Sequence, residues 1–189
     1  MSEPICRKAT TKDLAGVVAL QDLNLVSNLS EDQKKDGFLS GAFSEEQFAE
    51  MNQDVGILVG VDDDKVVGFI CIGSVEFNLP YPLPKAMIEE FSRIQFDRKS
   101  LSTYECVIAG PVCVAKEKRG TGLFDFMYGQ VYKILPAHIN LITTLVSKSN
   151  PRSLKAHEKV GMQTVGDFHY QGRDFVIMVR PLHQVSATS

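Results

Sequence analysis

The chain has 189 residues, 44% of them hydrophobic and 23% charged, with a formal net charge of −3. This is the composition of a soluble globular domain with a sizeable core, and it gives no reason to expect a nucleic-acid or membrane partner. The start, MSEPICRKAT, lacks the apolar run of a secretory signal, and no stretch approaches the ~18 apolar residues of a membrane span. We therefore expect a cytoplasmic protein.

Capping residues and the spacing of apolar positions divide the chain into strands and helices. Thr10 and Asp13 form a capping pattern ahead of one helix, and Ser44 caps another. In chain order we expect a strand at 5–9, a helix at 13–26, a short helix at 45–51, strands at 55–61 and 65–75, a helix at 85–96, a strand at 104–114, a helix at 123–135, a strand at 139–146, a helix at 151–161 and a strand hairpin at 162–182. This order predicts a single mixed α/β domain over residues 1–182 and a disordered tail at 183–189.

Two proline-containing segments interrupt this pattern. Residues 76–103 carry three prolines, which exclude a regular strand up to Pro84. This segment is either an insertion over a binding cleft or a plain connecting helix. In the strand at 104–114, Pro111 removes a backbone donor, so this strand should bulge or lose a partner there.

The cysteines give no sign of a metal site. Cys6, Cys71, Cys106 and Cys113 have no C-x-x-C spacing and no histidine at the intervals of a metal ligand set. Each lies in an apolar stretch, where a reduced cysteine behaves as a small buried hydrophobic residue. We expect free thiols and no metal.

A glycine loop, Arg119-Gly120-Thr121-Gly122, lies between an apolar strand and a helix. Free N–H groups and the helix dipole make such a turn an anion site, and Arg119 adds a charged donor. A Walker loop would need Lys and Ser or Thr after Gly122, and a dinucleotide fingerprint would need a third glycine where Asp125 stands. Both common nucleotide motifs are therefore excluded, and a plain tight turn remains the alternative.

A second pattern follows about thirty residues later, after another buried strand, in the sequence NPRSLKAHEKVGM. Its Asn150, Ser153 and His157 share one helix face, and Gly161-Met162 closes the helix. Together with the glycine loop, this pattern resembles the GNAT superfamily of N-acetyltransferases. The likeness extends to the first strand and helix and to the final hairpin.

The resemblance implies a GNAT-like fold, which is a mixed, mostly antiparallel sheet flanked by helices and holding a splayed strand pair at an acetyl-CoA site. It also implies acetyl-CoA as co-substrate and an amine acceptor, either a small molecule or a protein amine. The strand would pair with the pantetheine arm and the loop would wrap the pyrophosphate, while one helix would present polar groups to the coenzyme. The implied coenzyme-binding residues are Val112, Cys113, Val114, Arg119, Gly120, Thr121, Gly122, Leu123, Phe124, Asn150 and Ser153.

The catalytic residues are less clearly marked. His157 stands where the family usually has a tyrosine that assists the leaving thiolate, and an imidazole can either donate or accept a proton there. Glu105, in the strand at 104–114, is the best general-base candidate, with Asp167, His169 and Tyr170 as further ones. Phe124 also departs from the family, because a small residue usually ends the loop.

The favoured interpretation is an acetyl-CoA-dependent N-acetyltransferase that transfers the acetyl group directly to an amine. The alternatives are a non-catalytic acyl-CoA-binding or regulatory module and an unrelated nucleotide binder. The non-catalytic module stays open because His157 replaces the usual tyrosine and no general base is clearly marked. The acceptor, the acyl length and the oligomeric state, including a dimer, also stay open.

Overall fold

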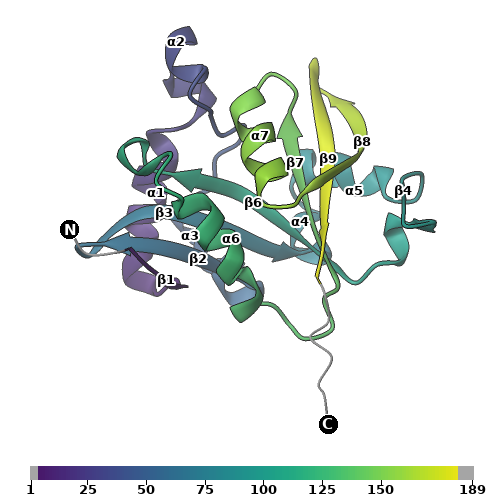
Figure 1. The fold of residues 1–189 in the computed structure, drawn as a ribbon, viewed down its shortest axis with the longest axis horizontal. Coiled ribbons are helices and arrows are strands. Elements are labelled where there is room, and N and C mark those ends of the chain that lie inside the picture. Colours follow the sequence, from purple (N-terminus) through teal and green to yellow (C-terminus); the bar gives the residue numbers. More distant parts are fainter. Residues whose placement is uncertain (1–3, 183–189) are drawn as a thin grey trace.

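Residues 4–182 are described by the computed structural model, so the expected tail at 183–189 lies outside the described part of the chain. In this part a seven-stranded sheet has the order β1-β2-β3-β6-β7-β9-β8 (Figure 1). Its neighbouring strands are antiparallel except β6 and β7, which are parallel. The strands are β1 (Ile5–Lys8), β2 (Gly56–Asp62), β3 (Lys65–Ser74), β6 (Cys106–Val114), β7 (Leu141–Ser147), β8 (Gln163–Tyr170) and β9 (Arg173–Pro181). The predicted α/β class with a mostly antiparallel sheet is confirmed.

Helices cover both faces of the sheet. Figure 1 shows α6 and α7 in front of it and α1 and α3 behind it. Within residues 4–182, no helix is long and apolar enough to cross a lipid bilayer. The helices are α1 (Leu14–Asp22), α2 (Glu31–Lys34), α3 (Glu45–Asp54), α4 (Val75–Asn78), α5 (Pro82–Glu90), α6 (Leu123–Gln130) and α7 (Pro151–Lys159).

A pair of glycines sets the position of α6. Gly60 of β2 lies opposite Gly68 of β3, and together they leave a notch in the sheet surface. A Cβ on Gly68 would lie 2.9 Å from the sulfur of Met127, and one on Gly60 would lie 3.2 Å from a methyl group of Leu123. Larger side chains would push α6 outward. The notch therefore holds the start of α6, and with it the glycine loop, close to the sheet.

The helix expected at 85–96 begins and ends earlier, as α5. Pro82 lies in its first turn, where the fixed φ of proline suits a helix and its missing N–H costs nothing. Beyond Glu90 the chain forms a small hairpin, because Asp97 and Arg98 adopt positive φ values of 46° and 65°. The hairpin strands are β4 (Gln95–Phe96) and β5 (Lys99–Ser100).

Other helix ends also differ from the sequence-based expectation. The helix expected at 13–26 stops at Asp22, and the one at 123–135 continues beyond Gln130 only as a 3₁₀ turn. The single-turn helices α2 and α4 were not predicted. Each begins at a serine cap, with Ser30 accepting a hydrogen bond from the N–H of Gln33 and Ser74 from that of Phe77.

The segment 76–103 packs into an apolar cluster separate from the main core. Met87, Phe91 and Leu101 are buried there against Phe168 and Phe175 of β8 and β9. Because this cluster anchors the segment to the far half of the sheet, α4 and α5 have a fixed place beside the cleft described below. Its description as an insertion stays a prediction.

The four cysteines are free, as expected. Cys71, Cys106 and Cys113 are buried and Cys6 is half-buried. Burial raises the pKa of Cys106 to about 11 and that of Cys113 to about 12, so both stay protonated at neutral pH. They serve as small apolar side chains of the sheet.

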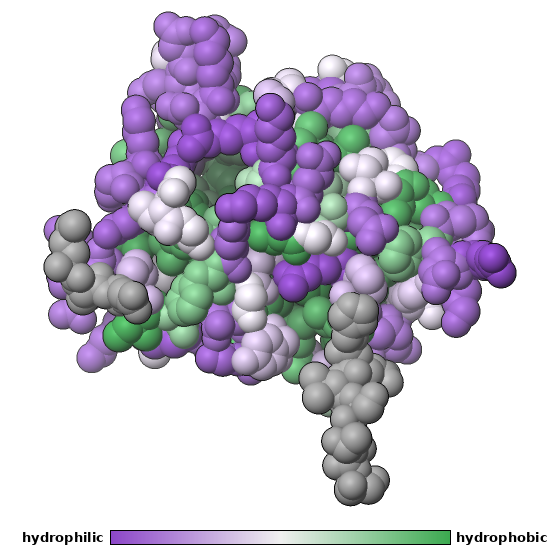
Figure 2. Space-filling model, viewed as in Figure 1, coloured by the Kyte–Doolittle hydropathy of each residue, from purple (hydrophilic) through white to green (hydrophobic). Residues whose placement is uncertain are grey.

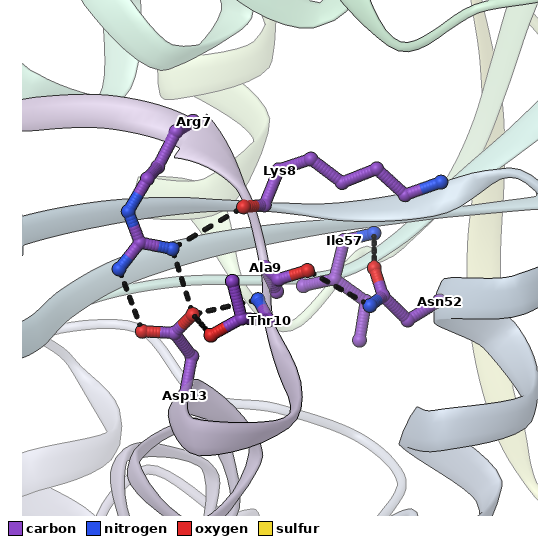
Figure 3. Close-up of polar contacts among 7 residues, drawn as sticks. All are labelled: Arg7, Lys8, Ala9, Thr10, Asp13, Asn52 and Ile57. Carbon is purple, nitrogen blue, oxygen red and sulfur yellow. Dashed lines mark hydrogen bonds and ion pairs between the residues drawn. The ribbon is translucent and has the colours of Figure 1, made fainter.

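The entry into α1 is held by a charged cluster (Figure 3). The carboxylate of Asp13 accepts hydrogen bonds of 2.7 and 2.9 Å from the guanidinium of Arg7. It also accepts 2.7 Å bonds from the backbone N–H and the hydroxyl of Thr10. Chiefly the hydrogen bonds from Arg7, with those from Thr10, hold the pKa of Asp13 well below its usual value against the opposing effect of burial.

A half-buried amide, that of Asn52, joins the same turn to the sheet. Asn52 of α3 donates to the carbonyl of Ala9 and accepts from the N–H of Ile57, both at 3.0 Å. The N–H of Ala9 in turn donates to the carbonyl of Ile57 at 2.7 Å. One side chain therefore ties α3, the end of β1 and the start of β2 together (Figure 3).

We expect Asp13→Asn to lower the free energy of unfolding by about 1–3 kcal/mol at neutral pH, because it removes the acceptor of Arg7 and Thr10. The pKa of Asp13 is lower in the folded chain than in the unfolded chain. Its contribution is therefore complete above the unfolded pKa of about 4 and is lost as the pH falls through the folded value. Urea unfolding of both proteins should give a constant difference from about pH 7 to about pH 5 and a smaller one below about pH 4.

The matched control is Asp22→Asn, which changes an exposed carboxylate at the other end of the same helix. It should change the stability by less than about 0.5 kcal/mol. A difference for Asp13→Asn that does not shrink at about pH 3 would show that the cluster is not what stabilises the helix entry.

Candidate active site

The parallel strands β6 and β7 stay paired over only a short length. Their register covers three residue pairs and ends with Ile108 opposite Thr143. One step further, the hydroxyl of Thr144 donates to the carbonyl of Ala109 at 2.6 Å, so a side chain takes the place of a strand-to-strand bond. Beyond this point the two strands diverge, which opens a gap in the sheet.

The strand β6 bulges where it leaves β7. Val112 pairs with Ile70 of β3, but Ala109 pairs with Ile72, so Gly110 and Pro111 together lie opposite a single residue. Pro111 has no N–H to donate, which suits a position outside the ladder. The predicted bulge near Pro111 is confirmed.

One edge of residues 112–114 faces the gap. On the other edge Val112, Cys113 and Val114 pair with β3, and the N–H of Ala115 donates to the carbonyl of Val67 at 2.8 Å. Because hydrogen-bonded and non-bonded pairs alternate along an antiparallel ladder, the backbone groups of Val112 and Val114 point away from β3. The backbone groups of Val112 and the N–H of Val114 offer an unpaired strand edge to a ligand in the gap. The carbonyl of Val114 accepts a hydrogen bond from Arg119, and the side chain of Cys113 is buried.

The glycine loop follows directly and presents backbone donors. Gly120 and Gly122 have φ values of +78° and +89°, and a Cβ on either would meet open space. In the described residues, the N–H groups of Gly120, Thr121 and Gly122 make no hydrogen bond with the protein. Gly122 is also the N-cap of α6, so the helix dipole adds to the same place. The arrangement suits a phosphate group.

The side chain of Arg119 forms hydrogen bonds within the protein. Its Nε donates to the carbonyl of Val114 at 3.0 Å, Nη1 to that of Asp36 at 2.8 Å, and Nη2 to the side chain of Asn24 at 2.5 Å. The guanidinium therefore joins the loop, the end of β6 and the segment after α1. Three of its five N–H donors thus bind protein oxygens, and Arg119 also lines the outer cavity described below. Its contact with a phosphate stays a prediction.

Asn150 holds the same segment from the other side. As N-cap of α7 it accepts from the N–H of Ser153 at 3.2 Å, and its amide nitrogen donates to the carbonyl of Phe38 at 2.9 Å. Arg152 adds an ion pair of 3.2 Å with Asp36. Residues 36–38 are thus tied to both predicted motifs.

His157 is buried, with only 4% of its surface exposed. Its Nδ1 lies 2.8 Å from the carbonyl oxygen of Ser153. Because a carbonyl only accepts, Nδ1 carries the proton and Nε2 keeps a lone pair. That Nε2 has no hydrogen-bond partner among the described residues. Burial lowers the pKa of His157, so the ring is neutral at physiological pH.

Two aromatic rings hold the imidazole in place. The rings of Phe124 and Tyr128 contact it edge-on, with centroids at 5.2 and 5.6 Å. The two departures from the family pattern are therefore neighbours, since Phe124 packs against the histidine that replaces the usual tyrosine. Tyr128 is fully buried and its hydroxyl has no partner in the described chain. Sequence reasoning did not single it out, because it reads as an ordinary core position of α6.

Two adjoining cavities follow the gap. The outer cavity, of about 240 Å³, lies between the glycine loop and the start of α7. The inner cavity, of about 260 Å³, lies between β6 and β7 and reaches α4 and α5, with His157 in its wall. Figure 2 shows an apolar recess framed by hydrophilic side chains between α2 and α7. The walls that both cavities share are formed by Phe38, Leu39, Val112, Asn150 and Ser153.

The structure brings most of the predicted coenzyme residues together around the outer cavity. Val112, Cys113, Val114, Arg119, Gly120, Gly122, Phe124, Asn150 and Ser153 line it. Leu123 is buried beneath the loop against the sheet, and the hydroxyl of Thr121 donates to the carbonyl of Lys118 at 2.7 Å. Sequence reasoning missed Phe38 and Leu39, whose only signal is an apolar pair within a polar stretch.

Glu105 is not brought to the cavities. It lies just before β6, is exposed, and is five residues away from the bulge at Gly110. The other base candidates also lie elsewhere, since Asp167 pairs with Lys148 at 2.5 Å and His169 with Asp174 at 2.8 Å. Across residues 4–182, no three His, Cys, Asp or Glu side chains gather as a metal site would require.

The chain was compared with known proteins. A family model described as Acetyltransferase (GNAT) family matches residues 22–162, whereas no curated protein sequence matches significantly. Among solved structures, a ribosomal-protein-alanine N-acetyltransferase from Brucella melitensis is 16% identical with a TM-score of 0.61, over 94% of this chain and 99% of that one.

Two further structures have the same fold. A phosphinothricin acetyltransferase from Sinorhizobium meliloti in complex with AcCoA is 14% identical with a TM-score of 0.59, over 100% of this chain and 93% of that one. NAA60 from Arabidopsis thaliana, in complex with a bisubstrate analogue, is 15% identical with a TM-score of 0.62, over 96% and 99%. The sheet with its diverging strands, the loop and the family match over most of the sequence lead to one conclusion: the chain belongs to the acetyltransferase (GNAT) family.

Proposed function

We propose that this protein is an acetyl-CoA-dependent N-acetyltransferase that transfers the acetyl group directly to a primary amine. The observation that carries the proposal is the meeting of three features at one gap in the sheet. These are the free strand edge at 112–114, the open N–H groups of the glycine loop, and an inner cavity with His157 in its wall.

In this proposal the outer cavity takes the coenzyme. The backbone N–H groups of Gly120, Thr121 and Gly122 bind the pyrophosphate, and the free backbone groups of Val112 with the N–H of Val114 pair with the pantetheine arm as an added strand would. The thioester then lies at the shared wall between the cavities, beside Ser153 and below His157. Two solved structures with this fold support the placement: the Sinorhizobium meliloti protein is in complex with AcCoA, and the Arabidopsis thaliana protein is in complex with a bisubstrate analogue.

His157 handles the proton in the proposed reaction. The transfer forms a nitrogen–carbon bond and breaks the carbon–sulfur bond, and a proton from the amine has to reach the departing thiolate. Nε2 has a lone pair, no protein partner and almost no exposed surface. In this proposal the side chains around the ring move on binding, after which Nε2 accepts the amine proton and returns it to the sulfur. The structure thus favours histidine as an acceptor first and a donor second.

A non-catalytic acyl-CoA-binding module is the alternative function. It is favoured by one observation, since no carboxylate among the described residues lines the inner cavity to act as a second base. Calorimetric titration with acetyl-CoA, CoA and ATP, followed by an amine screen, separates the two. Binding of acetyl-CoA with acetyl transfer supports the enzyme, binding without transfer supports the module, and no binding of acetyl-CoA contradicts both.

Gly120→Val should weaken CoA binding at least about ten-fold, because a branched side chain would occupy the space through which a phosphate reaches the loop. Calorimetric titration with CoA measures the effect. The matched control is Gly161→Val, since Gly161 has a similar φ of +86°, also faces open space, and lies after the end of α7 outside the walls of both cavities. Equal affinity in the two variants would contradict the assignment of the loop.

His157→Phe should leave CoA affinity within about two-fold and lower kcat by about 100-fold, because the ring packing is kept and the proton acceptor is lost. Steady-state rates across about pH 6 to 9 check this, with His138→Phe at an exposed position as control. A rate that is unchanged over this range would make His157 a structural residue only.

A further inference from the structure

The inner cavity has an uncharged wall. Its lining in the described residues contains no Asp, Glu, Lys or Arg. The outer cavity is different, since Lys118, Arg119, Asp125, Arg152 and Lys159 all line it. Neutrality is therefore a property of the inner cavity rather than of the whole cleft.

Several polar side chains of this wall are already hydrogen-bonded within the protein. The hydroxyl of Thr144 donates to Ala109, that of Ser147 bonds with Ser149 at 2.8 Å, and the amide of Asn78 donates to the carbonyl of Ser74 at 2.8 Å. Nε2 of His157 is the buried wall atom left without a partner in residues 4–182. A hydrogen-bond donor that reaches this buried nitrogen would give it its missing partner.

Aromatic rings form the outer part of the wall. The rings of Phe43 and Tyr81 meet edge-to-face at 5.1 Å, so the segment before α3 contacts the start of α5 beside the cavity. The backbone of Phe43 is fixed by buried Gln21, which donates to its carbonyl at 2.9 Å and accepts from its N–H at 2.8 Å. Tyr81 also packs against Phe77 at 5.5 Å. This apolar surface is fixed from both sides.

We propose, resting on the proposed function, that the acceptor is a primary amine on an apolar, preferably aromatic, body without a second ionised group. Its nitrogen lies on the His157 side of the inner cavity and its body packs against Phe43 and Tyr81. A carboxylate or a second ammonium on the acceptor would enter the inner cavity without a counter-ion, and burying an unpaired charge costs much more than apolar burial returns. Both a free amine and the apolar first residue of a peptide have this chemistry.

The test compares acceptors that differ in their charged groups; the phenylalanine pair differs by the carboxylate alone, and the diamine also lacks the ring. We expect kcat/KM for 2-phenylethylamine to exceed that for phenylalanine, which adds a carboxylate, and that for 1,5-diaminopentane, which adds an ammonium, by at least about ten-fold. A short peptide amide beginning with phenylalanine distinguishes a small-molecule acceptor from a peptide acceptor. If the cavity takes a small molecule, 2-phenylethylamine is the better acceptor; if it takes the first residue of a peptide, the peptide amide is. Equal or better rates with phenylalanine or the diamine would overturn the proposal.

Two variants test the wall itself. Tyr81→Ala should lower kcat/KM for 2-phenylethylamine about ten-fold and leave the diamine unchanged, while Tyr132→Ala, at a 64% exposed position outside the cavity, should change neither. Ala42→Asp places a carboxylate at an exposed wall position, where it does not threaten folding, and should raise the relative rate of the diamine about ten-fold. An unchanged preference in both Tyr81→Ala and Ala42→Asp would contradict the assignment.

Binding measurements separate this inference from the proposed function. Calorimetric titration of CoA-saturated protein with 2-phenylethylamine and with phenylalanine reports on the cavity without any turnover. Selective binding of 2-phenylethylamine with no acetyl transfer would overturn the proposed function and support the inference. Acetyl transfer with no preference between the two ligands would support the function and overturn the inference.

Discussion

The divergence of β6 from β7 is the constraint on which the rest of the site depends. Two parallel strands that stay paired leave no free backbone edge, whereas here pairing ends at Ile108 and Thr143. The unpaired half of β6 still needs support, and it receives this from β3 on its other edge. The sheet therefore stays continuous while exposing Val112 and Val114 to a ligand. The cavities on both sides of this point exist because the two strands separate.

Side chains that mark the sequence motifs also hold the site together. Arg119 and Asn150 bind the backbone of residues 36–38 from opposite sides, so a segment far away in sequence becomes the shared wall of both cavities. The same arrangement separates two electrostatic environments. The outer cavity has charged groups and open N–H donors suited to phosphates, and the inner cavity is neutral with a single unpaired nitrogen on His157. An anionic coenzyme and an apolar amine would each meet a matching surface.

The predictions from sequence succeeded where the signal was local. The hairpins, the cap at Asn150, the bulge near Pro111 and the face shared by Ser153 and His157 all follow from residue type and spacing over a few positions. Helix ends were less accurate, as at 85–96, because positive φ at Asp97 and Arg98 has no sequence signature as strong as a glycine. Glu105 was predicted at the site only because it belongs to the expected strand at 104–114. In the structure it is exposed and lies just before β6.

By itself, the sequence determined the fold class, the glycine loop, the helix that carries His157 and the family to which they point. These depend on backbone conformation, which is encoded by neighbouring residues. Only the tertiary structure decided that the guanidinium of Arg119 binds protein carbonyls, that Nε2 of His157 is the free nitrogen, and that Phe43 meets Tyr81 beside an uncharged cavity. Several of these groups come from segments far apart in the sequence, and their geometry comes from the packing of the whole sheet and not from any one segment.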